Sequence, residues 1–561
     1  MANIRLSTFS GILPQVSPRL LPEENATVAE NALFDSGRLG SIRSTVSTND
    51  HNNVAFVVPS NVKTIYRHRD RQGNGYWLAW TQHVHAVPSP IAEDPYDRLY
   101  WTGQTYPRFA LGTEVASSAS PSYQPSAARR LGIPAPATAP SASILEPIAD
   151  DTLNVSSRAY VYTWVSGLGE EGPPSPASTI IDVKDGETVV LSFSTGDVPS
   201  YIYNTGGAPA KRRVYRTDIN GEYRYLFDML ASENNLLDVR TDEELGEIIV
   251  SSNWDAPADE TSADHPDGPL LGLTAMPNGM LAGYAGRSVF FAEQFIPSAW
   301  PKAYSLTVKS KVVGLASISI GLMVLTQGKP VLMTGSSPAG MGAVEIDSDQ
   351  ACVSARSIVD MGEVAVYASP DGLVAAGENG VQLVTEGVFT REQWQALKPE
   401  SIHAYKFEGR YVFFYDTGTA RGGYVLNTRT KNPEVVTLDF YAVAGHSDPV
   451  EDALYLVIVD GNGGVVKKFH AGTPLTYTWQ SKELRVENPI CPGCAMIDAE
   501  AYPIQFTLYA DGQQKHAQSV TDGKLFRLPA GYRAKTFQIK VTGTGEINQI
   551  MVAENPSEIA Q

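Results

Sequence analysis

The chain has 561 residues, 43% of them hydrophobic and 19% charged, which is too much apolar material for one core and enough for several domains. Asp and Glu (61) outnumber Lys and Arg (43) for a net charge of −18, which excludes a protein that grips nucleic-acid phosphates through a basic surface. Three cysteines exclude a disulfide-stapled scaffold, and the absence of an apolar run of ~18 residues predicts no membrane insertion.

Residues 1–48 are predicted to form an N-terminal arm that contains one short helix. Residues 23–33 have Pro22 near their start and Gly37 past their end, an arrangement that favours a helix. No basic stretch followed by an apolar stretch opens the sequence, so no secretory signal is expected. We therefore expect synthesis in a reducing cytoplasm.

Residues 49–120 contain short aromatic and β-branched runs separated by turn residues, the pattern of β-strands. The same pattern returns in residues 270–479, so we expect this segment to complete the fold formed there. Aromatic residues on strands are mostly core residues, with a sugar-stacking surface as the alternative. The aromatic residues concerned are Trp77, Trp80, Tyr96, Tyr100 and Trp101.

Two histidines in this segment, His83 and His85, stand two residues apart on a predicted strand. Their side chains should therefore face the same side, and they have the residue type to bind a metal. The sequence offers no obvious third ligand. We interpret them as surface histidines of an edge strand, with chelation as the alternative.

Residues 121–150 hold six prolines together with Ala and Ser, which predicts an extended linker. Residues 151–250 follow as an inserted β-module, starting with the alternating run YVYTWV. Asn220-Gly221 joins two alternating runs, the pair favoured in tight hairpins. This pattern is typical of a fibronectin type III-like sandwich.

An acidic stretch closes the module: residues 238–267 contain ten Asp or Glu and one basic residue, Arg240. We interpret it, and residues 251–269 in particular, as a solvated acidic linker. An acidic rim on a channel is the alternative.

Residues 270–479 repeat one all-β unit five times, at a spacing of roughly 40–45 residues, the period of four-stranded propeller blades. The copies begin at LGLTAMPNGM, VVGLASISIG, SARSIVDMGE, SIHAYKFEGR and LDFYAVAGHS. One helix is expected within them, at FTREQWQALKP, since Thr390 and Gln393 have capping-box spacing and Pro399 stops it. With residues 49–120 added, the propeller should have about six blades.

Residues 480–561 alternate again and predict a C-terminal β-sandwich. Within them, Cys491-Pro492-Gly493-Cys494 has the spacing of half a zinc site or of a redox pair. Because the chain has only three cysteines and this segment lies between strands, we interpret it as a turn, with a metal site or a late disulfide as the alternatives.

No motif in the sequence predicts catalysis, a cofactor or a metal. Ser369-Pro370-Asp371-Gly372 is similar to the turns of sialidase propellers but lacks the rest of that pattern, so we expect a hairpin turn. Asp347 and Asp349 lack the glycine and distal glutamate of a calcium loop. A glycosidase carboxylate pair and a sialidase-like activity remain open, but we expect no enzyme.

Four strings in the sequence resemble segments of bacteriophage tail proteins, most closely the nozzle, or tail tubular protein B-like, components of short-tailed phages. They are PRLLPEENATVAENALFDSGRL, YVYTWVSGLGEEGPPSP, SIVDMGEVAVYASPDGL and FTREQWQALKPESIHAYKFEGRYVFFYDT. None of them is a catalytic signature, and the resemblance runs from the arm to about Gly472.

The resemblance implies a structural virion protein located in the tail. Six copies would form a homohexameric ring below the tail adaptor protein, touch the tail fibre proteins, and enclose a channel for phage genomic DNA without sequence-specific binding. An acidic lining would repel the DNA phosphates and let the genome slide. A propeller at the tail tip that binds a host receptor or glycan is the alternative function.

Overall fold

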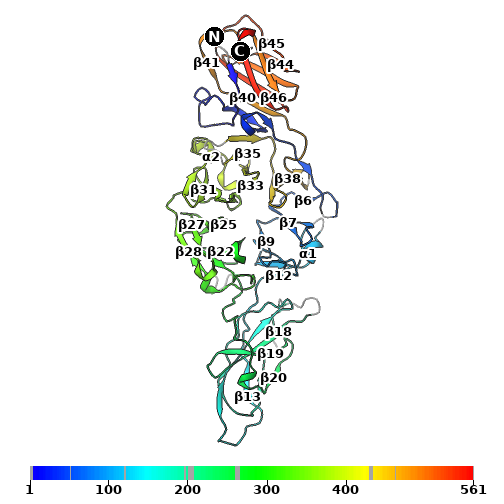
Figure 1. Cartoon of the computed structure of the whole chain (residues 1–561), viewed down its shortest axis with the longest axis vertical. Coiled ribbons are helices and arrows are strands. Elements are labelled where there is room, and N and C mark those ends of the chain that lie inside the picture. Colours follow the sequence, from blue (N-terminus) through cyan, green and yellow to red (C-terminus); the bar gives the residue numbers. More distant parts are fainter. Residues whose placement is uncertain are drawn as a thin grey trace.

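The computed structural model describes residues 4–50, 52–118, 122–194, 198–199, 202, 208–259, 266–428, 434–461 and 463–559. Three all-β bodies follow one another along the long axis (Figure 1). A sandwich with both chain termini lies at one end, a propeller in the middle and a second sandwich at the other end. The predicted fold class is confirmed: a β-propeller with an inserted fibronectin III-like sandwich and a C-terminal sandwich.

Each of the five sequence repeats forms one antiparallel sheet of the propeller. The first two sheets are β21 (Leu271–Ala275), β22 (Leu281–Ala285), β23 (Ser288–Phe291) and β24 (Leu306–Thr307), and β25 (Val312–Ile318), β26 (Gly321–Thr326), β27 (Val331–Thr334) and β28 (Gly342–Glu345). The next two are β29 (Val359–Asp360), β30 (Val364–Ala368), β31 (Leu373–Gly377) and β32 (Gly380–Leu383), and β33 (His403–Phe407), β34 (Arg410–Asp416), β35 (Arg421–Asn427) and β36 (Glu434–Leu438). The fifth is β37 (Ala444–Asp448), β38 (Ala453–Asp460) and β39 (Gly463–Lys468).

The N-terminal third of the chain closes the ring. Strands β5 (Val46–Ser47) and β6 (Val57–Pro59) pair with β39 and so extend the fifth repeat with strands from the other end of the sequence. Two further sheets come from the same region: β7 (Thr64–Arg69) with β8 (Gly75–Trp80), and β9 (His85–Pro88), β10 (Leu99–Thr102), β11 (Arg108–Ala110) and β12 (Arg129–Arg130).

The described residues therefore form seven blades, one more than the six or so expected. The difference arises because residues 49–120 contribute two blades of their own besides the strands that close the ring. One of these two blades, β7–β8, has only two strands, so its sequence does not show the repeat of roughly 40–45 residues from which the other blades were predicted.

Small residues line the innermost strands, where seven strands converge. Gly445 of β37 shows why: a Cβ atom there would lie 2.9 Å from the Tyr455 carbonyl oxygen and 3.0 Å from the Tyr405 ring. Ala316 on β25 and Ala404 on β33 occupy comparable inner positions. Glycine and alanine in these strands permit the close approach of neighbouring backbones.

The inserted sandwich has two facing three-stranded sheets and one two-stranded sheet. Its strands are β13 (Ser141–Ile144), β17 (Val189–Ser192) and β20 (Asn235–Asp238); β15 (Tyr160–Val165), β18 (Lys211–Thr217) and β19 (Tyr223–Leu230); and β14 (Val155–Arg158) with β16 (Ile181–Lys184). The predicted hairpin at Asn220-Gly221 joins β18 to β19. The predicted linker, residues 121–150, is shorter than expected because β12 belongs to a blade and β13 to the sandwich.

The terminal sandwich is completed by the N-terminal arm. Its sheets contain β1 (Ile4–Leu6), β47 (Ile547–Ala553), β42 (Cys494–Ala499) and β45 (Phe526–Arg527), and β40 (Tyr477–Ser481), β46 (Ala534–Gly543), β43 (Ile504–Ala510), β44 (Gln513–Val520) and β41 (Leu484–Ile490). Strand β2 (Ala26–Glu30) pairs in parallel with β36 and antiparallel with β40, so one sheet runs from the propeller into the sandwich. The short β3 (Ala32–Leu33) pairs with β4 (Gly40–Ser41).

The helix expected at residues 23–33 is therefore wrong, since β2 and β3 occupy that segment. The helix expected in the repeats is confirmed as α2 (Arg391–Ala396), with the predicted capping box: Gln393 N–H donates to Thr390 Oγ1 at 3.1 Å. A second helix is α1 (Gly112–Ala116). Single 3₁₀ turns lie at Asp35–Gly37, Asp242–Glu244, Pro277–Gly279, Lys302–Tyr304, Pro338–Gly340, Ala355–Ser357, Pro399–Ser401 and Pro556–Glu558.

In the described part of the chain no helix has the length and apolar character needed to span a membrane.

Candidate functional site

A cavity of about 390 Å³ lies at the centre of the propeller. All seven inner strands contribute to its wall, so it occupies the axis about which the blades are arranged (Figure 1). One lining residue from each of these strands is Thr64, His85, Ala275, Ala316, Asp360, Ala404 and Gly445. A volume of this size fits a small molecule, within the range of protein ligand pockets.

The two histidines singled out in the sequence lie together in this cavity. The ring centroids of His83 and His85 are 4.5 Å apart. The expectation of a surface pair was wrong, because β9 is the innermost strand of its sheet and faces the axis. Burial lowers the pKa of His85 to about 4. Burial, with His85 and nearby cations, lowers the pKa of His83 well below its usual value. Both imidazoles are therefore neutral at pH 7.

Two cations that the sequence analysis missed also line the cavity, Arg356 and Lys63. Arg356 is held in place by its Nη2, which donates to the Lys63 carbonyl oxygen at 3.0 Å and to the Val443 carbonyl oxygen at 2.8 Å. The positive charges of Arg356 and Lys63 both contribute to the lowered pKa of His83, so the three groups lie close together. Sequence separation hid this cluster: Arg356 and Lys63 are 293 residues apart.

Acidic groups are scarce in the same wall. Among the described residues that line the cavity, Asp360 supplies the only carboxylate. Hydrolysis of a glycosidic bond ordinarily requires two carboxylates that flank the bond. The cavity wall therefore lacks the pair that a glycosidase of the common type would place here.

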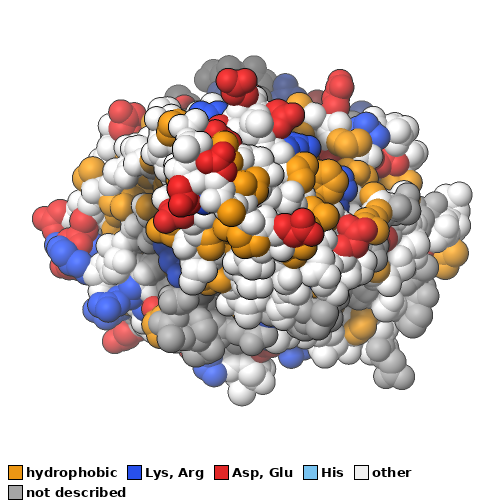
Figure 2. Space-filling view, turned by 90° about the horizontal axis from the view of Figure 1, so that it is seen from below, with side chains coloured by type: hydrophobic (Ala, Val, Ile, Leu, Met, Phe, Trp, Pro, Cys, Tyr) orange, Lys and Arg blue, Asp and Glu red, His pale blue; other side chains and the backbone are white. Residues whose placement is uncertain are grey.

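A different surface stands out on the inserted sandwich. Among the described residues, 21 large hydrophobic side chains are exposed, and eleven of them fall within residues 141–250. Figure 2, which views the molecule from the end where this sandwich lies, shows apolar side chains with acidic ones between them. Such a concentration on one domain is typical of an interaction surface.

Part of this exposed set follows two sheet edges, and we call it the apolar edge: Phe227, Leu230, Leu237 and Val239. Strands β19 and β20 are the last strands of their sheets. They lie near each other, since the Arg240 guanidinium is 5.9 Å from the centre of the Phe227 ring. An exposed edge with apolar side chains is a template for pairing with another chain.

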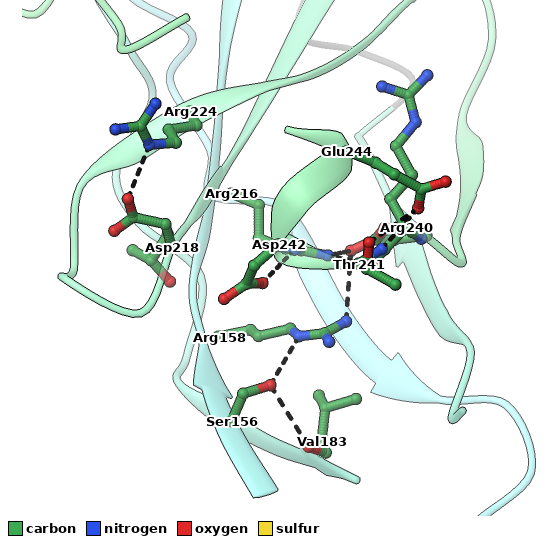
Figure 3. Close-up of polar contacts among 12 residues, drawn as sticks. Ser156, Arg158, Val183, Arg216, Asp218, Arg224, Arg240, Thr241, Asp242 and Glu244 are labelled. Carbon is green, nitrogen blue, oxygen red and sulfur yellow. Dashed lines mark hydrogen bonds and ion pairs between the residues drawn. The ribbon is translucent and has the colours of Figure 1, made fainter. Parts of the chain in front are cut away.

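Part of the acidic stretch is held by ion pairs, while Glu243, Glu244, Glu247 and Asp267 are exposed. Figure 3 shows Arg216 beside Asp242, to which its Nη2 donates at 2.5 Å. Nη1 of the same guanidinium donates to Asp238 at 3.0 Å, and Arg130 pairs with Asp259 at 2.9 Å. The interpretation as a solvated stretch is thus wrong for Asp238, whereas Asp242 and Asp259 are half-exposed, and Glu260 and Asp264 lie outside the described residues.

The remaining sequence candidates have structural roles. Ser369 N–H donates to the Gly372 carbonyl oxygen, which confirms the hairpin turn between β30 and β31. Asp347 pairs with Lys329. Cys491 follows β41 and Cys494 is the first residue of β42; both are free thiols, and burial raises the pKa of Cys494. No group of three metal-ligating side chains occurs in the described ranges.

Four of the five clustered aromatic residues of the N-terminal strands are core residues, as predicted, and the fifth, Tyr96, is half-buried against the core. Trp77, Trp80, Tyr100 and Trp101 are at most 2% exposed. Trp77 packs against Tyr455 of the neighbouring blade, with ring centroids 4.8 Å apart. These rings are therefore unavailable as a sugar-stacking platform.

Comparison with known proteins finds similar solved structures but no match by sequence. No protein-family model and no curated protein match the sequence. Among solved structures, a chain in the crystal structure of BBS1N in complex with ARL6DN aligns over 71% of this chain and 94% of its own, with 10% identity and a TM-score of 0.29. An exo-beta-1,3-galactanase from Phanerochaete chrysosporium aligns over 71% of this chain and 100% of its own, with 11% identity and a TM-score of 0.20. At these TM-scores neither likeness bears on activity, ligand or partner.

Proposed function

We propose that this chain is a structural subunit of a bacteriophage tail that assembles into a homohexameric nozzle ring. The ring extends the DNA-ejection channel below the tail adaptor protein and anchors tail fibre proteins. The phage-tail assignment comes from the resemblance of the four sequence strings. The structural observation that carries the assembly is the apolar edge of the inserted sandwich.

The apolar edge supports contacts between copies of this chain. Its side chains are substantially exposed: 42% for Phe227, 56% for Leu237 and 68% for Val239. Natural proteins usually protect such edges with lysine, proline or a covering segment. Ring closure requires one surface of a subunit to meet a different surface of the next. Residues 246–249 pair with the first half of β19, so the open part of the apolar edge is the second half of β19 together with β20. In this proposal that open part, at one end of an elongated subunit, supplies the first of these surfaces.

Charge argues against nucleic acid as the occupant of this edge. Residues 141–250 contain 18 Asp or Glu and eight Lys or Arg, so the inserted sandwich repels phosphate backbones. The propeller cavity is sized for a small ligand and does not fit a DNA duplex. In this proposal the DNA channel is enclosed by the ring of subunits, and DNA passes without being held.

The proposal includes no catalytic activity. It rests on the presence of a single carboxylate, Asp360, in the described wall of the cavity. It also rests on the core positions of Trp77, Trp80, Tyr100 and Trp101 in the N-terminal strands.

Charged substitutions on the apolar edge test the proposal. Native mass spectrometry of the unmodified chain should show higher oligomers, and the double variant F227D/L237D should lose them, with an association constant weakened about tenfold or more. The matched control is V450D, since Val450 is 71% exposed but belongs to the propeller. Assembly of F227D/L237D equal to that of V450D would exclude the apolar edge as the subunit contact.

A further inference from the structure

The wall of the propeller cavity has an unusual charge pattern in a protein of net charge −18. Two cations, Lys63 and Arg356, and two neutral imidazoles, His83 and His85, line it, and among the described lining residues Asp360 is the only carboxylate. These groups come from three separate blades, and only closure of the ring brings them together. A cluster of like charges in a cavity is unfavourable unless an opposite charge offsets it.

We propose that the propeller cavity binds a small oxyanion, a phosphate group, between Arg356 and the His83–His85 pair, with Lys63 at the rim. This site is independent of the assembly proposed above, because the apolar edge lies on the inserted sandwich. The phosphate group belongs to inorganic phosphate or to a small phosphate monoester, and both fit a cavity of about 390 Å³.

Arg356 is the anchor of the proposed site. A guanidinium carries five N–H donors in a planar fork that matches the oxygens of phosphate. The two carbonyl contacts, to Lys63 and Val443, use only Nη2. They fix the plane of the fork, and the guanidinium also interacts with the Tyr405 hydroxyl, which lines the same cavity. Five N–H donors exceed these contacts, so donors remain for a phosphate oxygen. A donor group fixed before binding loses less entropy when the ligand arrives.

The histidine pair adds donors that respond to the ligand. Each neutral imidazole offers one N–H donor, and each protonated imidazole offers two. Burial and the neighbouring cations lower the pKa of His83, and burial lowers the pKa of His85 to about 4. A bound anion reverses part of that effect, since a negative charge nearby favours the protonated imidazole. Binding of the anion is therefore expected to be coupled to proton uptake by the pair.

The same surroundings disfavour a metal ion at His83 and His85. A metal cation would be repelled by the positive charges of Lys63 and Arg356. These two charges already disfavour protonation of His83. Two imidazoles are also fewer than the three protein ligands of a typical catalytic zinc site. Within the described residues no third ligating side chain joins them.

Calorimetric titration of the full chain with inorganic phosphate tests the proposal. Sodium chloride at matched ionic strength serves as the blank. The unmodified chain should bind one phosphate saturably, and R356M should bind about tenfold more weakly or worse. R356K keeps the positive charge but lacks the planar guanidinium, so its affinity for phosphate should lie between those of the unmodified chain and R356M. The control R421M removes an exposed arginine of β35, outside the cavity, and should bind like the unmodified chain.

Because R356M also removes two hydrogen bonds to carbonyl groups, a second variant separates binding from folding. H83Q/H85Q keeps neutral donors but cannot take up a proton. Sulfate is the probe here, since its charge is constant between pH ~7 and ~5. Affinity of the unmodified chain for sulfate should rise across that interval, because the bound anion favours protonation of the imidazoles. The pH dependence should vanish in H83Q/H85Q. The groups that face the pair, Lys63, Arg356 and Asp360, are unchanged in this variant.

Glycerol 3-phosphate distinguishes the two sources of the phosphate group. Tighter binding of the ester than of inorganic phosphate assigns the site to a phosphate monoester, and equal or weaker binding assigns it to inorganic phosphate. Absence of saturable phosphate binding to the unmodified chain would overturn the proposal. So would equal phosphate binding by the unmodified chain, R356M and H83Q/H85Q.

Discussion

Arg216 and Asp238 form an ion pair of 3.0 Å in which neither side chain is exposed to solvent. The Tyr160 hydroxyl donates to the same carboxylate at 2.8 Å, and Arg216 also donates to the Arg240 carbonyl oxygen at 2.7 Å. The pair joins β18 to β20, which belong to the two facing sheets of the inserted sandwich. It therefore fixes the end of the sandwich that carries the apolar edge.

Removing one member of this pair should unfold the inserted sandwich more readily. D238N removes the buried counter-charge of Arg216 and leaves it only the half-exposed carboxylate of Asp242, at a cost of up to about 3–5 kcal/mol. Urea unfolding of the full chain should show an early transition that the unmodified chain lacks. The control E243Q changes an exposed acidic residue of the same stretch and should leave the curve unchanged. Identical curves for D238N and E243Q would contradict a structural role for the pair.

A second ion pair links the propeller to the inserted sandwich. Arg98 Nη1 lies 2.7 Å from Glu170 Oε1, and Arg98 Nε lies 2.7 Å from Asp94 Oδ2, with all three side chains less than 10% exposed. Asp94 and Arg98 belong to a propeller blade and Glu170 to the sandwich. R98M should therefore loosen the junction, with faster hydrogen exchange at residues 166–172.

The matched control for this junction is R71M, because Arg71 pairs with Asp97 at the surface, where it is 44% exposed. An exposed pair contributes about 0–1 kcal/mol, so R71M should exchange at the rate of the unmodified chain. Unchanged exchange in R98M would show that the junction is held by other contacts.

Contact between two blades should weaken in acid. Burial raises the pKa of Glu451, but hydrogen bonds from Tyr455 and Arg69, and the charge of Arg67, outweigh it and hold the pKa at about 2. An unfolded glutamate titrates near ~4.3, so the unfolded chain binds more protons between these values. This contribution to stability is present above pH ~4.3 and is lost as the pH falls through about 2.

The acid effect can be isolated with E451Q. Its melting temperature should be lower than that of the unmodified chain at neutral pH, and the difference should shrink as the pH falls toward about 2. E386Q, a change at an exposed glutamate, is the control and should follow the unmodified chain throughout. A constant difference between E451Q and the unmodified chain at all pH values would refute the linkage.

Trp394 attaches the helix α2 to its blade. The side chain is fully buried, and its Nε1–H donates to the Ser369 carbonyl oxygen at 2.8 Å. W394A should cost about 3–5 kcal/mol of stability, because it leaves a cavity and an unpaired carbonyl. W394F keeps most of the ring and should cost less. Chemical denaturation measures both, and an equal loss in the two variants would assign the whole effect to the hydrogen bond.

The five repeats were predictable because each blade is a contiguous run of hairpins, whose turns and alternation are local. The strand β2 was not predictable in the same way. Pro22 and Gly37 satisfy the local rules for a helix, but Ala29 and Glu30 pair with strands more than 400 residues away. Long-range pairing overrode local propensity there.

The cavity could be predicted only in part, for the same reason. The spacing of His83 and His85 correctly placed the two rings together, but not on the propeller axis. Arg356 and Lys63 have no sequence signal that connects them, since ring closure alone brings them to one wall. The apolar edge could not be predicted from the sequence either. The alternation of residues in β19 indicates a strand, but it does not show which of its side chains are covered by a neighbouring element.

The most direct test of the proposed function is the subunit number of the full-length protein, measured by native mass spectrometry at the highest concentration at which it stays in solution. The nozzle proposal predicts a closed ring of six subunits, which F227D/L237D disrupts and V450D preserves. A protein that is monomeric under all conditions, or whose assembly is indifferent to the apolar edge, would contradict it.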